Sequence, residues 1–200
     1  MYDVSLRPEA ALTGSLDLEA IIAAFPPTYT VKGMFCARYA ALLGGDYAAL
    51  APMLIAPARG ANYVAFKDYP QADYTRIVAT AAAKVFPKLP LTEAVRRVAR
   101  DDFQTFGTSV FGRVLMTLVG DPHTALAYLP DAYSRVAPGP NVWTEDLDAR
   151  TIRLVFRRHR GIAEYMLGQL EGIVMTFDRT PIVTVRRLEP ETLAFDVVYK

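Results

Sequence analysis

The segment Ile162–Phe177, with the sequence IAEYMLGQLEGIVMTF, decides the fold class of this chain. Its large apolar residues recur at intervals of three or four, at Ile162, Met166, Leu170, Ile173 and Phe177. This period places them on one stripe of a helix. The flanking segments alternate instead, at 142–144 and 151–156 before the helix and at 182–185 and 193–199 after it. The sequence therefore predicts a long helix packed on a small antiparallel sheet.

Residues 30–140 have the pattern of helices and not of strands. Met34, Phe35 and Tyr39 begin a helical repeat that Gly44-Gly45 ends, and a second short helix over residues 46–55 is expected to pair with it in antiparallel fashion. Further helices are predicted over residues 70–87, 92–120 and 122–129, with Pro130 as a kink and Pro138 to Pro140 as the end.

These patterns predict one α+β domain over residues 1–200. Its parts are an N-terminal arm with a short helix (1–29), a helical half (30–140) and a sheet-plus-helix half (141–200). A chain of 200 residues with 52% hydrophobic residues contains enough apolar material for one substantial core.

The charge and cysteine content exclude several classes of function. A net charge of +1 predicts no nucleic-acid surface. The longest apolar stretch, Val110–Gly120, is interrupted by Gly112 and Arg113 and is too short to span a membrane. Cys36 is the single cysteine, and the N-terminus lacks the pattern of a signal peptide. We therefore expect a cytoplasmic protein without disulfides.

No catalytic motif is recognisable in the sequence. It contains no P-loop, no nucleophile elbow, no HExxH, no GxGxxG and no Ser/His/Asp ordering. Cys36 lies in an apolar helical stretch, where a thiol is usually buried and inert. Asp101-Asp102 is typical of a helix start or a turn. The sequence therefore favours a protein that is not an enzyme.

The basic run Arg157-Arg158-His159-Arg160 directly precedes the predicted helix. Cations are unfavourable at a helix N-terminus unless an anion lies among them. Strand alternation would place Arg158 and Arg160 on one face, which could hold a phosphate or carboxylate. The alternative is that the arginines are solvated or paired with acids such as Glu164, Glu145 and Asp146, which contributes about 0–1 kcal/mol per pair.

Three other features have an ordinary interpretation beside a functional one. Gly168 and Gly172 allow close packing against their helix, or the wall of a flat ligand cavity, and packing is the simpler explanation. His123 follows Asp121-Pro122 and is expected to be a capping or exposed residue and not a metal ligand. The aromatic residues are expected in the core, namely Phe103, Phe106, Phe111, Tyr128 and Tyr165.

Four strings in this order resemble the H-NOX family of haem nitric-oxide/oxygen-binding domains and its wider fold group, which includes four-vinyl-reductase sensor domains and TRAPP subunits. The strings are Val31–Gly33, Ala94–Phe111, Phe156–Arg160 and Tyr165–Gly172. The phrases at 31–35, 66–70 and 167–172 also resemble a family of uncharacterised bacterial proteins of about this length. The resemblance implies a ligand cavity between the two halves, bordered by the aromatic residues.

The chain departs from the H-NOX haem motifs. Those domains anchor the haem propionates with Tyr-x-Ser-x-Arg, where this chain has Phe156, Arg158 and Arg160. The position of the haem-ligating histidine falls near Ala127, and His123 lies about one helical turn earlier. These departures predict a domain without cofactor.

Our first hypothesis is a sensory or regulatory domain that binds a small apolar ligand with an acidic head. The predicted contacts are Phe156, Arg158, Arg160, Tyr165, Gly168 and Phe111. The second hypothesis is a protein-interaction or scaffold subunit that acts as a homodimer or with another protein partner, and the third is a haem-based gas sensor.

Overall fold

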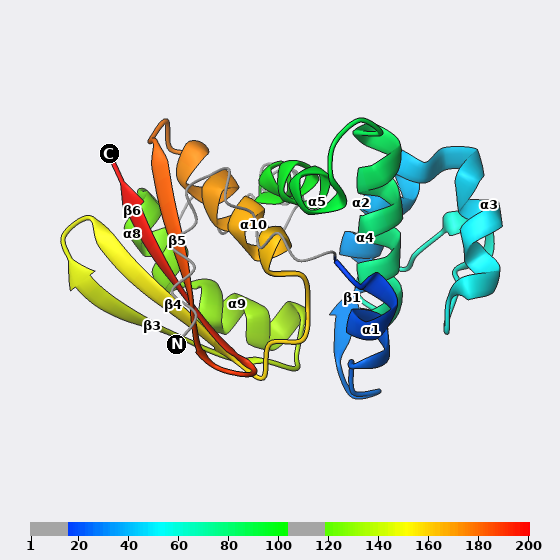
Figure 1. Cartoon of the computed structure of the whole chain (residues 1–200), viewed down its shortest axis with the longest axis horizontal. Coiled ribbons are helices and arrows are strands. Elements are labelled where there is room, and N and C mark those ends of the chain that lie inside the picture. Colours follow the sequence, from blue (N-terminus) through cyan, green and yellow to red (C-terminus); the bar gives the residue numbers. More distant parts are fainter. Residues whose placement is uncertain (1–15, 104–118) are drawn as a thin grey trace.

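The computed structural model describes residues 16–103 and 119–200. Figure 1 shows the sheet on the left, the helices α2 and α4 on the right, and α5 and α10 between them. Two buried apolar clusters form the core, one mainly from residues 31–98 together with Ile162 and the other from residues 119–199. The predicted order of a helical half followed by an antiparallel sheet with one long helix is confirmed.

The helical half is built around α2 and α4. Its helices are α1 (Leu18–Ala23), α2 (Gly33–Leu43), α3 (Tyr47–Leu50), α4 (Gln71–Val85) and α5 (Leu91–Arg100). The strands β1 (Thr30–Lys32) and β2 (Asp68–Pro70) pair antiparallel and hold the starts of α2 and α4 together. Tyr39, Leu43 and Ile77 are buried where these helices meet.

Several predictions for this half are wrong. The helix predicted over residues 92–120 ends at Arg100, and the strands β1 and β2 lie in a stretch where no strand was predicted. Residues 46–55 do not form a single helix paired with α2, because α3 ends at Leu50 and a 3₁₀ turn covers Ala51–Met53. Pro52 has no backbone N–H to continue an α-helix. The partner of α2 is instead α4.

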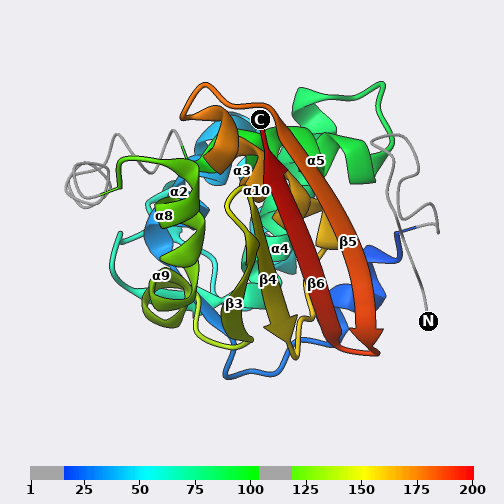
Figure 2. The same ribbon diagram turned by 90° about the vertical axis from the view of Figure 1, so that its left-hand side faces the viewer.

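The second half is a four-stranded antiparallel sheet of order β3-β4-β6-β5. Its strands are β3 (Asn141–Asp148), β4 (Thr151–Arg157), β5 (Pro181–Glu189) and β6 (Thr192–Tyr199). The helix α10 (Ala163–Met175) lies behind the sheet in the view of Figure 2, with α8 (Pro122–Ala127) and α9 (Leu129–Val136) beside β3. Phe156, Phe195 and Leu170 are fully buried between the sheet and α10.

The two halves are joined where α10 packs on α5. A Cβ atom at Gly168 would lie 2.1 Å from the carbonyl oxygen of Arg96, and one at Gly172 would lie 2.0 Å from that of Arg100. The two helices therefore touch backbone to backbone, which only glycine permits at these positions. The side chain of Glu171 accepts hydrogen bonds from Arg96 and Arg100 and holds the same contact electrostatically. No helix within the described ranges 16–103 and 119–200 is long and apolar enough to cross a membrane.

Candidate functional site

A cavity of about 160 Å³ lies between the helical half and the sheet half. Its wall is largely apolar and draws on both halves, with Val31 and Phe35 from the first and Phe156 and Met166 from the second. A cavity of about this volume, lined by apolar side chains, is large enough for one benzene ring. Two polar groups of side chains border it, one at the loop before α10 and one around Asp102.

The first polar group is His159 with Arg160, on the loop between β4 and α10. The Arg160 guanidinium forms an ion pair of 2.5 Å with Glu191. Its Nε atom is buried and has no hydrogen-bond partner among the residues that the structure describes. An unpaired buried donor costs free energy, and a ligand that accepts a hydrogen bond from it recovers that energy. Arg160 is among the residues that line the cavity, so its positive charge lies close to any ligand held there.

Arg158 does not join this group. The strand β4 ends at Arg157, and Arg158 has a φ of 59°, in the left-handed region, so strand alternation stops before it. Its side chain is exposed, and its carbonyl oxygen accepts a hydrogen bond of 3.1 Å from the Tyr29 hydroxyl. The predicted face shared by Arg158 and Arg160 is thus wrong, because it assumed that the strand continues through residue 160.

The imidazole of His159 borders the cavity and lies edge-on to Phe156, with 6.1 Å between the ring centroids. Burial, reinforced by the nearby charge of Arg187, lowers the pKa of His159 to about 4. The ring is therefore neutral at pH 7 and can donate one hydrogen bond and accept another. The sequence pattern placed His159 on the face opposite Arg160, and only the turn after β4 brings the two to one cavity.

The lowered pKa of His159 predicts how stability depends on pH. The pKa in the folded chain is below the usual 6.5, so the unfolded chain takes up this proton first as the pH falls. We expect the native protein to lose stability between about pH 6.5 and pH 4, and the His159→Gln variant to lose less. Urea unfolding at pH 7 and pH 5 measures the difference. Equal losses in the two proteins would contradict this expectation, and both should change in parallel between pH 7 and pH 8.

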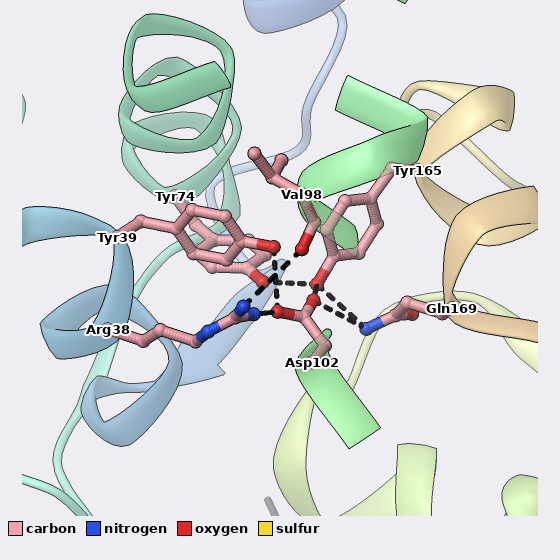
Figure 3. Close-up of polar contacts among 7 residues, drawn as sticks. All are labelled: Arg38, Tyr39, Tyr74, Val98, Asp102, Tyr165 and Gln169. Atoms are coloured by element: carbon pink, nitrogen blue, oxygen red, sulfur yellow. Dashed lines mark hydrogen bonds and ion pairs between the residues drawn. The ribbon is translucent and has the colours of Figure 1, made fainter. Parts of the chain in front are cut away.

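The second polar group is a buried cluster around Asp102 (Figure 3). One carboxylate oxygen accepts a hydrogen bond of 2.7 Å from Tyr39 and pairs with the Arg38 guanidinium. The other accepts hydrogen bonds from the Tyr165 hydroxyl and, at 3.2 Å, from the Gln169 amide. Asp102 is only 5% exposed, and these four partners come from α2 and α10. The cluster therefore links the two halves at the cavity wall.

Two further tyrosines extend the cluster along the cavity. Tyr74 on α4 is hydrogen-bonded to the Tyr165 hydroxyl, and Tyr133 on α9 donates a hydrogen bond of 2.7 Å to the side-chain oxygen Oε1 of Gln169. Burial raises the pKa of Tyr74, Tyr133 and Tyr165 above the ordinary value, so all three keep their protons at neutral pH. Sequence analysis missed this cluster, because its members are up to 131 residues apart along the chain and no short motif contains them.

The remaining predicted contacts are divided between the cavity and the core. Phe156 and Tyr165 border the cavity, whereas Gly168 packs against α5, in agreement with the packing explanation. Phe111 lies outside the described residues, as does Phe106. His123 is hydrogen-bonded to the Tyr199 hydroxyl at 2.9 Å and lies 3.1 Å from a carboxylate oxygen of Asp146.

Arg160 has an acidic partner, and Cys36 is buried. Arg160 pairs with Glu191 and not with Glu164, Glu145 or Asp146. Cys36 is buried in the helical core, and burial raises the pKa of its thiol to about 12, as expected of an inert cysteine. No group of three or more His, Cys, Asp or Glu side chains suited to a metal ion occurs in the part of the chain that the structure describes.

Comparison with solved structures shows the fold. An H-NOX protein from S. oneidensis in the Fe(II)NO state superimposes with a TM-score of 0.67 at 14% identity, covering 84% of this chain and 99% of that one. The Fe(II) unliganded H-NOX protein from K. algicida has a TM-score of 0.64 at 14% identity, with 84% and 96% covered. A variant of the T. tengcongensis H-NOX protein has a TM-score of 0.63 at 19% identity, with 84% and 97% covered.

Comparison of the sequence with curated proteins gave no match. The family model described as "Protein of unknown function (DUF2378)" matches residues 25–199. Because this match spans far more than half of the 200 residues, the chain belongs to that family, and its fold is that of H-NOX domains.

Proposed function

We propose that this protein is a non-catalytic sensory domain that binds a small apolar molecule with an acidic head in the cavity between its two halves. The observation that carries the proposal is the cavity itself, because residues of both cores form its wall and the cationic Arg160 lines it. Binding sites for small molecules are typically apolar with a few polar groups that set orientation. The H-NOX-like fold supports a sensory role.

The position of the cavity allows the binding of a ligand to act as a signal. A ligand in it contacts Val31 and Phe35 of the helical half together with Phe156 and Met166 of the sheet half. A ligand shifts a conformational equilibrium only by as much as it binds one arrangement better than another. Because the ligand touches both halves, its affinity depends on how they are placed relative to each other.

The proposed ligand is not haem, because the residues of the cavity do not fit a haem held as in H-NOX domains. Phe156 has no hydroxyl for a propionate, and Arg158 is exposed outside the cavity. His123 makes its contacts with Tyr199 and Asp146, away from the cavity wall. A volume of about 160 Å³ is below the roughly 300–1,000 Å³ of pockets for drug-sized ligands. A Soret band in protein expressed with haem supplied would overturn this part of the proposal.

Titration calorimetry with benzoate at pH 7 tests the acidic head. We expect benzoate to bind, and the Arg160→Gln variant to bind it about tenfold or more weakly, because a hydrogen bond to a charged group contributes about 1.5–3 kcal/mol. Arg158→Gln is the matched control, since its side chain is exposed and borders a different, surface depression. Its affinity should stay within about twofold of the native value.

Glu191 gives a second measurement in the same experiment. The Glu191 carboxylate forms an ion pair with the Arg160 guanidinium, so it competes with an anionic ligand for that guanidinium. Glu191→Gln should therefore bind benzoate more tightly than the native protein. No binding by the native protein, or equal binding by the Arg160→Gln and Arg158→Gln variants, would refute an acid-binding site at Arg160.

A further inference from the structure

We propose that the ligand carries a hydroxyl group in addition to its carboxylate, and that it is a one-ring hydroxyaryl carboxylic acid. This inference rests on the proposed function and adds the chemistry of the second polar group. It is carried by the direction of the hydrogen bonds in the Asp102 cluster, which borders the same cavity as Arg160.

Every hydroxyl proton of the cluster is already used. A carboxylate only accepts hydrogen bonds, so Tyr39 and Tyr165 both donate to Asp102. The single proton of Tyr165 is thereby occupied, and Tyr74 must be the donor in its hydrogen bond with Tyr165. The Tyr133 hydroxyl donates to the side-chain oxygen Oε1 of Gln169 at 2.7 Å, and the Met166 sulfur lies 3.1 Å from the same hydroxyl.

The amide protons of Gln169 are used in the same way. Its nitrogen donates to the Tyr165 oxygen at 2.7 Å and to Asp102 at 3.2 Å. Tyr74 and Tyr133 line the cavity. Because their hydroxyl protons are already donated, only the oxygen lone pairs remain, and lone pairs accept hydrogen bonds. This wall therefore favours a ligand group that donates, such as a hydroxyl, and gives nothing to a group that can only accept.

The other polar group has the opposite character. Arg160 brings a guanidinium group, which only donates hydrogen bonds, and the neutral imidazole of His159 can donate as well. A carboxylate fits this side and a hydroxyl fits the tyrosine side. Both sides border one cavity of about 160 Å³, the volume of a cavity that holds a benzene ring. One ring that carries both substituents meets both requirements.

The test compares 4-hydroxybenzoate, benzoate and 4-fluorobenzoate by titration calorimetry at pH 7. Fluorine is close to a hydroxyl in size but has no proton to donate. We expect 4-hydroxybenzoate to bind about tenfold more tightly than benzoate, and 4-fluorobenzoate to bind no more tightly than benzoate. A preference for 4-fluorobenzoate equal to that for 4-hydroxybenzoate would mean that the wall recognises size, and would overturn the inference.

Variants locate the hydroxyl contact. Tyr133→Phe and Tyr74→Phe remove the acceptor oxygens and should bring the affinity for 4-hydroxybenzoate close to that for benzoate measured in the same variant. Tyr133→Phe is the less disruptive of the two, since Tyr133 is only partly buried. Tyr63→Phe is the matched control, because its hydroxyl is paired with Tyr47 at 2.8 Å in the helical core, outside the cavity wall.

The outcomes separate this inference from the proposed function. Arg160-dependent binding of benzoate without a preference for the hydroxyl would overturn the inference alone. Binding of neither acid would overturn both. A hydroxyl preference that persists in both Tyr74→Phe and Tyr133→Phe would place the donor contact elsewhere and would also refute the assignment.

Discussion

Replacing Gly168 by alanine is expected to lower the free energy of unfolding by about 2–4 kcal/mol, although alanine is ordinarily the better helix former. The added Cβ would lie 2.1 Å from the Arg96 carbonyl oxygen and 2.8 Å from the Ala99 side chain. Backbone cannot yield as the end of a flexible side chain does, so α10 and α5 must move apart. The loss corresponds to a fall in melting temperature of roughly 4–16 °C for a domain of this size.

Thermal and urea unfolding of Gly168→Ala measure this effect, with Gly45→Ala as the control. A Cβ at Gly45 would meet nothing within 4 Å, so that substitution should be close to neutral. A melting temperature of Gly168→Ala equal to the native value would show that α5 and α10 are farther apart than the backbone contact requires. The same displacement would alter the cavity, because the neighbouring Gln169 and Leu170 on α10 form part of its wall.

The second large effect is expected from Asp102→Ala, which should destabilise the protein by about 3–5 kcal/mol. The substitution leaves the Arg38 guanidinium without its carboxylate, and Arg38 is itself only 17% exposed. It also leaves the hydroxyl protons of Tyr39 and Tyr165 without an acceptor in a buried site. An uncompensated buried charge together with unpaired donors accounts for a loss of this size.

Urea unfolding of two comparison variants tests this explanation. Asp68→Ala removes an ion pair with Lys32 at a position where the Asp68 side chain is 50% exposed, and should cost no more than about 1 kcal/mol. The double variant Arg38→Met/Asp102→Leu removes the charge together with its partner and should be less destabilised than Asp102→Ala. If the double variant is the less stable protein, the unpaired guanidinium is not the source of the loss.

The glycine contact and the Asp102 cluster both hold the two halves of the chain together beside the cavity. The glycine contact of Gly168 and Gly172 sets the distance between α5 and α10, and the Asp102 cluster joins α2 and α4 to α10 across the cavity. The hydroxyl protons of this cluster are donated within the cluster, which leaves only acceptor oxygens on Tyr74 and Tyr133. The residues that hold the two halves together therefore include the ones to which we assign recognition of the ligand hydroxyl.

The elements with a clear local period were predictable from the sequence. The stripe of apolar residues in α10 and the alternation in β4 and β6 depend only on residues close together in the chain. Gly168 and Gly172 were interpreted as packing positions, which is confirmed, because glycine in a helix interior needs a reason of that kind. Gly168 was also predicted to contact the ligand, but it is not among the residues that line the cavity. Phe156 and Tyr165 were placed at a cavity through the resemblance to H-NOX domains.

The conformation of the basic run at residues 157–160 was not predictable from the local sequence. Alternation predicted that Arg158 lies with Arg160, but β4 ends at Arg157 and the left-handed backbone of Arg158 turns its side chain into solvent. That turn brings His159 and Arg160 to the cavity together. Nothing in the four residues themselves marks the end of the strand.

The sequence by itself determined the class of fold and the order of its two halves, because these depend on composition and on the local period of apolar residues. Only the tertiary structure decided which polar side chains meet at the cavity. Asp102 contacts Tyr39 and Tyr165 from 63 residues away in either direction. The physical reason is that hydrogen bonds act over about 3 Å, so that a polar site exists only after packing has brought distant helices into contact.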